Sequence, residues 1–89
     1  MAKVVFTPNI QRHVGCPQAE AAGHTVREVL ERVFADNPRA RGYVLDDQSA
    51  LRRHMTIFVD GQMIRDRGRL ADKVNDNSTI HVFQALSGG

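Results

Sequence analysis

The chain has only one cysteine, no tryptophan and few aromatic residues, which make up 6% of its 89 residues. With Cys16 alone, no internal disulfide forms, as expected for a protein in a reducing compartment. Cys16 stands between Gly15 and Pro17, and nothing beside it in sequence obviously lowers the pKa of its thiol. A catalytic cysteine is therefore not expected.

Long apolar runs are also missing. No stretch approaches the roughly 20 apolar residues that a membrane-spanning helix needs. The apolar stretch at residues 1–6 is too short for a signal peptide. We therefore expect a cytoplasmic protein without a membrane partner.

Residue patterns for metal or nucleotide binding are lacking as well. The four histidines are scattered without the spacing of metal ligands. Asp46 and Asp47 form an acidic pair without a neighbouring base, which is more typical of a turn. No glycine-rich phosphate-binding loop occurs. The sequence thus predicts that the chain binds neither a metal nor ATP by itself.

The composition is otherwise that of a folded globular domain, with 42% hydrophobic and 25% charged residues. A length of 89 residues leaves room for one core, so we expect a single domain over residues 1–89. The net charge is +2, and seven of the ten arginines lie between Arg39 and Arg69. This basic region suits an acidic protein surface or a phosphate, unless it consists of solvated arginines around loops.

Alternation of apolar and polar residues predicts strands at residues 3–7 and 54–59 and a weaker strand at residues 18–22. Asp60-Gly61 is a hairpin signal that leads into a further strand at residues 62–64. The last strand is expected at residues 79–85, after a turn at residues 75–77. Residues 39–53 are mostly polar, and we interpret them as a long loop with room for a short strand or turn.

One helix is predicted at residues 26–37, because Thr25 and Glu28 have the capping-box spacing and Pro38 prevents continuation. Its apolar residues fall on one stripe that would cover a sheet: Val26, Val29, Leu30, Val33 and Phe34. The order strand, strand, helix, strand, short strand, last strand predicts an α+β protein of the β-grasp (ubiquitin-like) class. Its mixed sheet would have four to five strands covered by one main helix.

The last ten residues combine an apolar strand, the apolar pair Ala85-Leu86, the small Ser87 and the diglycine Gly88-Gly89. This ending resembles the MoaD/ThiS family of sulfur carriers, in which a β-grasp domain closes with a flexible Gly-Gly tail. The helix and the Phe-Val-Asp-Gly at residues 58–61 are similar to family elements, so the resemblance covers nearly the whole chain. Residues 39–53 resemble the CysO-like branch, although Gln84 and Ala85 stand where the family often has proline.

The resemblance implies that the chain is not an enzyme but the substrate of one. A MoeB/ThiF-type adenylyltransferase would use ATP to activate the carboxylate of Gly89, and sulfide or an enzyme persulfide would convert it to a thiocarboxylate. Glycine at both last positions suits this reaction, because a Cβ would collide in the passage to the α-phosphate of ATP. A downstream synthase would then accept the sulfur for molybdopterin, thiamine thiazole, cysteine or a secondary metabolite.

Candidates for partner binding follow from strand parity. If the apolar side chains at positions 57, 59, 80 and 82 face the core, Phe58 and Phe83 lie outside, beside Leu86 of the tail. The alternative is ordinary sheet packing with the opposite face inward. Arg52 and Arg53, with the arginines at positions 65, 67 and 69, would steer the chain toward an acidic partner.

Two other functions fit a β-grasp chain. A ubiquitin-like protein modifier would be joined to lysines through Gly89 and would leave high-mass conjugates in cell lysate. A β-grasp module that binds RNA or protein through its arginines would bind RNA with an affinity that falls steeply with salt, and it would function without Gly88 and Gly89. The few aromatic residues, without interleaved basic residues, disfavour nucleic acid as the partner.

Overall fold

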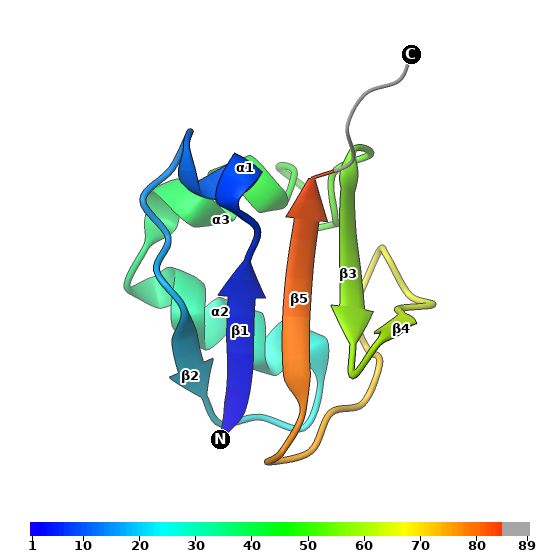
Figure 1. Ribbon diagram of the computed structural model, residues 1–89. Helices are drawn as coiled ribbons and strands as arrows, with labels where there is room; N and C mark the ends of the chain where they lie inside the picture. The colour runs from blue at the N-terminus through cyan, green and yellow to red at the C-terminus, as the bar shows by residue number, and fades with distance from the viewer. Residues whose placement is uncertain (85–89) are drawn as a thin grey trace.

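The computed structural model describes residues 1–84 and shows one mixed sheet with helices on one side (Figure 1). The expectations for Ala85, Leu86, Ser87, Gly88 and Gly89 lie outside the described residues. The elements in chain order are β1 (Ala2–Phe6), α1 (Pro8–Gln11), β2 (Ala19–Ala21), α2 (Val26–Ala35), α3 (Pro38–Val44), β3 (Met55–Val59), β4 (Gln62–Met63) and β5 (Thr79–Gln84).

The sheet has the strand order β2-β1-β5-β3-β4. The first and last strands, β1 and β5, run parallel at its centre, and the other neighbouring strands are antiparallel. Figure 1 shows α2 and α3 behind this sheet, with α1 at the end where β1 and β5 finish. This arrangement confirms the predicted α+β class and the β-grasp fold.

The main helix, α2, forms as its sequence predicts. The Thr25 hydroxyl accepts a hydrogen bond from the Glu28 amide at 3.2 Å, and the Glu28 carboxylate accepts one from the His24 amide at 2.8 Å. The first bond satisfies an amide that the first helical turn leaves without a partner, and the second ties the residue before the cap to the helix. Four residues of the apolar stripe are buried, and Val33 packs against them. The helix ends at Ala35, two residues earlier than predicted.

The prediction of a loop over residues 39–53 was wrong for its first part, which forms α3. Asn37 caps this helix by accepting a hydrogen bond from the Ala40 amide at 3.3 Å, and Pro38 suits the first turn. Only Ala40 and Val44 of α3 are buried, so the sequence carries little helical periodicity. A single β-bridge between Leu45 and Leu51 follows α3. It corresponds to the short strand or turn that was allowed for in the predicted loop.

Another helix, α1, occupies one turn directly after β1, where the sequence indicated only the end of a strand. Pro8 begins this turn, and Ile10 is fully buried in it. The β3–β4 hairpin forms as predicted, with Val59 paired to Gln62 and φ values of 50° at Asp60 and 87° at Gly61. Such a turn with two positive φ values matches the twist of the strands.

The buried apolar residues form one cluster between the sheet and the helices. Ile57, Ile80 and Val82 are fully buried, whereas Phe58 is half-buried and Phe83 is 38% exposed. Because successive side chains alternate between the two faces of a strand, this pattern puts both phenylalanines on the face without helices. Within residues 1–84, no helix has the length and apolar character needed to span a bilayer.

Candidate functional site

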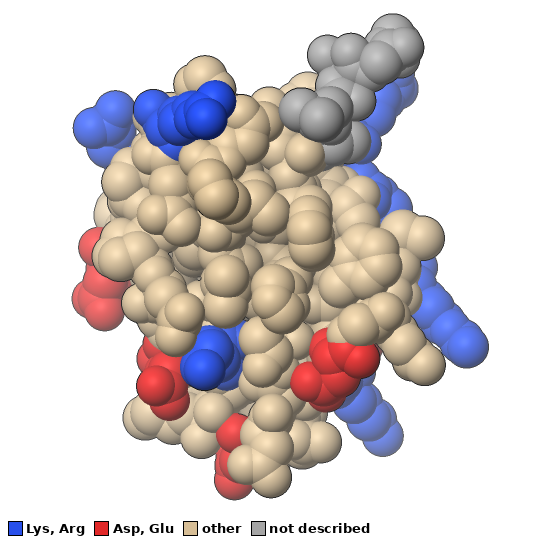
Figure 2. Space-filling model, in the orientation of Figure 1, with Lys and Arg blue, Asp and Glu red and all other residues tan. Residues whose placement is uncertain are grey.

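The face of the sheet that carries no helix is the candidate site, and we call it the open face. Strand pairing aligns its residues in rows, with Phe58 opposite both Met63 and His81, and Thr56 opposite Phe83. Figure 2 shows that the centre of this face is largely uncharged. Basic side chains lie along the margin beside β3 and β4, and acidic ones lie in the lower half, away from the finishing end of β5.

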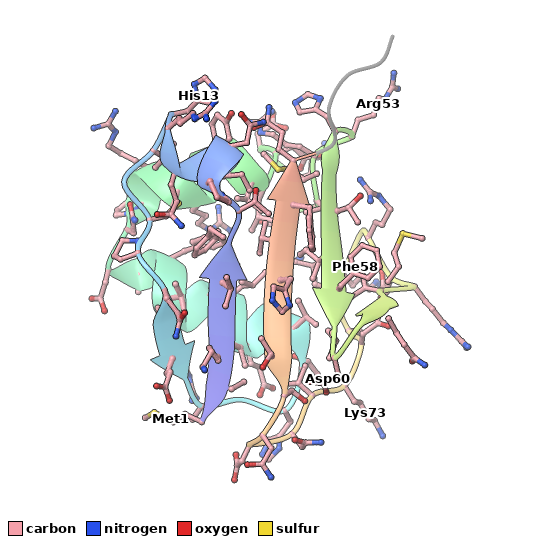
Figure 3. The ribbon with its side chains drawn as sticks, in the orientation of Figure 1. Met1, His13, Arg53, Phe58, Asp60 and Lys73 are labelled. Atoms are coloured by element: carbon pink, nitrogen blue, oxygen red, sulfur yellow. The ribbon has the colours of Figure 1, made fainter. Side chains whose placement is uncertain are left out.

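Three apolar side chains cross the open face from its edge to the end of β5, and we call them the apolar strip: Met63, Phe58 and Phe83. The rings of Phe58 and Phe83 meet edge to face with centroids 5.4 Å apart. Met63 is 59% exposed, and Phe58 lies between it and His81 (Figure 3). Exposed apolar residues in contact with each other are typical of a protein-binding surface. The structure thus brings the predicted pair Phe58 and Phe83 together.

The predicted arginines behave differently from one another. The Arg52 guanidinium donates to the Gly42 carbonyl at 3.0 Å. Arg67 donates to the carbonyls of Arg52 and Arg53 at 2.8 and 3.3 Å. Both therefore hold the polypeptide backbone in place. Arg53 is exposed just before β3, at the end of the molecule where β5 finishes (Figure 3).

Further exposed cations lie in the segment that follows β4, and with Arg53 they form what we call the basic flank: Arg53, Arg65, Arg69 and Lys73. Figure 2 shows blue side chains projecting along this margin, next to the apolar strip. Asp60 and Asp72 lie beside Arg65 and Lys73, so this margin is mainly but not wholly basic. An apolar surface with a mainly basic margin favours a partner with an apolar patch and an acidic rim. Lys73 was not among the predicted candidates, since only its position in the fold joins it to the arginines.

The end of β5 is the second part of the site, because the residues that carry the predicted tail follow it. Gln84 closes this strand opposite Met55 of β3, and its side-chain oxygen accepts a hydrogen bond from the Tyr43 hydroxyl at 2.8 Å. Tyr43 and Gln84 were not predicted as site residues. They are 41 positions apart in the sequence, and no local pattern links them.

Among residues 1–84, the remaining candidates do not gather into a reactive centre. Cys16 is only 2% exposed, and burial raises the pKa of its thiol. A buried neutral thiol is a poor nucleophile, in agreement with the expectation for this residue. Within residues 1–84, no three His, Cys, Asp or Glu side chains gather closely enough to hold a metal ion.

The sequence model of the ThiS family matches residues 10–89. No curated protein matches the sequence significantly. Among solved structures, the chain is similar to one in the Amycolatopsis orientalis BexX/CysO complex, with 24% identity, a TM-score of 0.82 and full coverage of both chains.

Two further solved structures have the same fold. Mycobacterium tuberculosis CysO is 22% identical with a TM-score of 0.79, over 97% of this chain and 100% of that one. The small archaeal modifier protein 1 (SAMP1) from Methanosarcina acetivorans is 24% identical with a TM-score of 0.77, over 99% of this chain and 95% of that one. At these identities the similarity establishes the fold.

Proposed function

Because the chain belongs to the ThiS family, we propose that it carries sulfur as a thiocarboxylate on Gly89 and donates it in a biosynthetic pathway. The chain supplies the reacting group, and partner enzymes supply the catalysis and the ATP. The observation that carries this proposal is the apolar strip, which ends at Phe83, one residue before β5 closes at Gln84.

The chemistry starts from a carboxylate, which is a poor acyl donor because its leaving oxygen would be strongly basic. A MoeB/ThiF-type adenylyltransferase transfers AMP from ATP to the Gly89 carboxylate and releases pyrophosphate. Sulfide then attacks the acyl carbon and AMP leaves, so that a C–S bond replaces the C–O bond to the phosphate. A persulfide enzyme would reach the same product through an acyl disulfide that a thiol reduces. A downstream synthase receives the sulfur.

Chain length limits where this activation takes place. The five residues from 85 to 89 span at most about 17 Å when fully extended, at roughly 3.4 Å each. The active site that receives Gly89 must therefore lie within that distance of Gln84. A partner seated on the apolar strip would begin its contact close to Gln84, since Phe83 precedes Gln84 directly.

The basic flank supports the same choice of partner surface. One of its four cations lies just before β3 and the other three lie in the segment after β4, and Figure 2 shows basic side chains along this margin. Complementary charge mainly increases the rate of encounter and fixes the orientation of the partner. We expect the adenylyltransferase to present an apolar pocket with an acidic rim. The similar Amycolatopsis orientalis chain comes from a complex of BexX and CysO, which supports a protein partner for a chain of this fold.

The decisive experiment is intact-mass spectrometry of the purified chain after incubation with an adenylyltransferase that activates related carriers, ATP and sulfide. We expect the mass gain of one oxygen replaced by sulfur, located at Gly89 by fragmentation. Reactions without ATP or without sulfide are the controls. An unchanged mass, with an enzyme that converts a related carrier in the same buffer, would refute the proposal. A mature polypeptide found to continue past Gly89 would do so too.

A protein-modifier function is the second candidate, because the similar Methanosarcina acetivorans structure is a small archaeal modifier protein. In that case an amine attacks the activated Gly89 and forms an isopeptide bond. Immunoblots of reduced cell lysate separate the two functions. High-mass conjugates that disappear when Gly88 and Gly89 are deleted indicate a modifier, and a single band at the mass of the free chain indicates a carrier.

A further inference from the structure

The Gln84 side chain is held at the point where β5 ends. It continues the row of Ile80 and Val82, so it points to the helix side of the sheet. There its oxygen accepts the hydrogen bond from Tyr43, while its backbone lies opposite Met55. An amide thus stands at the margin of the apolar core, with its partner on α3.

Tyr43 is itself held in place. The His13 ring, in the segment after α1, stacks on the Tyr43 ring with centroids 5.7 Å apart and an interplanar angle of 23°. His13 lies at the same end of the molecule as Arg53 and the end of β5 (Figure 3). The neighbouring Gly42 carbonyl accepts the hydrogen bond from Arg52, which ties this turn of α3 to the segment before β3. Elements from three parts of the chain therefore fix the phenol that reaches β5.

We infer that Tyr43 is a positioning residue, whose bond to Gln84 fixes the position and direction of the chain at the last described residue before Gly89 and its neighbours. This inference rests on the proposed activation of Gly89. The carboxylate must meet the α-phosphate of ATP, and a displacement of about 1 Å can slow such a reaction by about two orders of magnitude. Tyr43 contacts neither of these groups, so it acts through Gln84.

Kinetics of adenylation separate positioning from docking. Tyr43→Phe removes the hydroxyl and keeps the ring against His13. KM depends on docking through the apolar strip, whereas kcat depends on delivery of Gly89. We expect kcat to fall about tenfold and KM to stay within about twofold of the wild-type value. Val33→Ala is the control, because it loosens the helix side of the core and should leave kcat unchanged below its unfolding midpoint.

A second variant tests whether the effect comes from the hydrogen bond between Tyr43 and Gln84. Gln84→Leu removes the acceptor and should reduce kcat as much as Tyr43→Phe does. The double variant should lose no more than either single variant, because both changes break one interaction. Wild-type kcat in Tyr43→Phe, or losses that simply multiply in the double variant, would overturn the inference.

NMR relaxation of the free chain tests the anchoring without any enzyme. In Tyr43→Phe the order parameter of the Gln84 backbone amide should decrease, while that of Val82 should not. Equal values for Gln84 in both proteins would refute the inference whether or not sulfur is transferred. A decrease at Gln84 in a chain whose wild type never accepts sulfur would instead refute the proposed function and leave the anchoring role standing.

Discussion

Phe58 and Phe83 lie edge to face on neighbouring strands, with ring centroids 5.4 Å apart and planes at 71°. The pair lies on the open face, where each ring restricts the motion of the other. Side chains that are already ordered lose less conformational entropy when a partner covers them. Their contact therefore favours binding in a way that two isolated phenylalanines would not.

Phe83→Ala should weaken the complex with the adenylyltransferase by about 2 kcal/mol, roughly 30-fold in KM, because it removes the aromatic anchor of the apolar strip that lies nearest the end of β5. The free energy of unfolding should change much less than for truncation of the buried Phe34, which costs about 3–5 kcal/mol. Steady-state kinetics and urea unfolding measure the two effects. Val33→Ala should leave KM unchanged, and an unchanged KM in Phe83→Ala would exclude the apolar strip as the docking surface.

The free energy of unfolding should depend on pH through the carboxylate of Glu31. Its carboxylate accepts two hydrogen bonds from Arg41, at 2.8 and 2.9 Å, and one from Arg27 at 3.2 Å. Hydrogen bonding from Arg41 is the largest cause that lowers the pKa of Glu31 in the folded protein. Because the folded pKa is the lower one, the ionised carboxylate stabilises the fold above its unfolded pKa. This contribution is lost as the pH falls through the folded value.

Glu31→Gln should therefore reduce the free energy of unfolding at pH 7 by about 0.5–1 kcal/mol, since the side chains of this ion pair are about a third exposed. The difference between the wild type and the variant should shrink below about pH 4. Urea unfolding at several pH values measures it. A difference that stays constant down to pH 3 would show that the charge on Glu31 contributes nothing. Arg41→Lys keeps the positive charge but cannot donate two bonds to one carboxylate. This variant should therefore lose most of the stabilisation that the ion pair provides at pH 7.

Local patterns predicted those parts of the fold that local interactions determine. The Thr25 cap and the stripe of α2 are readable because their partners lie within a few residues. Alternation on β3 and β5 predicted the outward direction of Phe58 and Phe83. By contrast, α3 was missed, because much of what holds it comes from elsewhere, including the bonds of Arg41 to Glu31 ten residues earlier.

The same difference between local and long-range interactions explains which parts of the candidate site could be predicted. Sequence alone could not separate arginines that face solvent from those that bind backbone carbonyls, because the partners of Arg67 lie 14 and 15 residues away. Nor could it join Tyr43 to Gln84, which meet only because α3 packs at the end of β5. The prediction for Gly89 came from the family resemblance of the last ten residues, and it stays a prediction.

Substitutions at Gly23 and Gly42 test how closely the backbone before α2 packs against that helix. A Cβ on Gly23 would lie 2.9 Å from Cγ2 of Val29 and 3.0 Å from its amide nitrogen, whereas one on Gly42 meets nothing within 4 Å. Gly23→Ala should cost about 1–3 kcal/mol of stability, because the segment before α2 has to shift. Gly42→Ala, inside α3, should add about 0.5–1 kcal/mol. Urea unfolding midpoints that shift down for Gly23→Ala and up for Gly42→Ala would confirm this prediction. An unchanged midpoint in Gly23→Ala would contradict the close packing of Gly23 against Val29.

Gly89→Ala tests the chemistry most directly. The added methyl group is small and leaves a carboxylate of nearly the same basicity, so the intrinsic ease of adenylation hardly changes. What changes is the width of the chain at the position that must pass into the active site of the partner. We therefore expect thiocarboxylate formation, measured by intact mass, to fall by about two orders of magnitude or more, because the reacting carbon no longer reaches its position.

The matched control is Gly68→Ala, where a Cβ would come no closer than 3.9 Å to Asp66. Both variants should unfold within about 0.5 kcal/mol of the wild type, as surface substitutions usually do. Loss of the product in Gly89→Ala but not in Gly68→Ala would then assign the effect to the acyl terminus and exclude a folding defect. If Gly89→Ala instead accepted sulfur at the wild-type rate, the bare backbone at this position would have no role in activation.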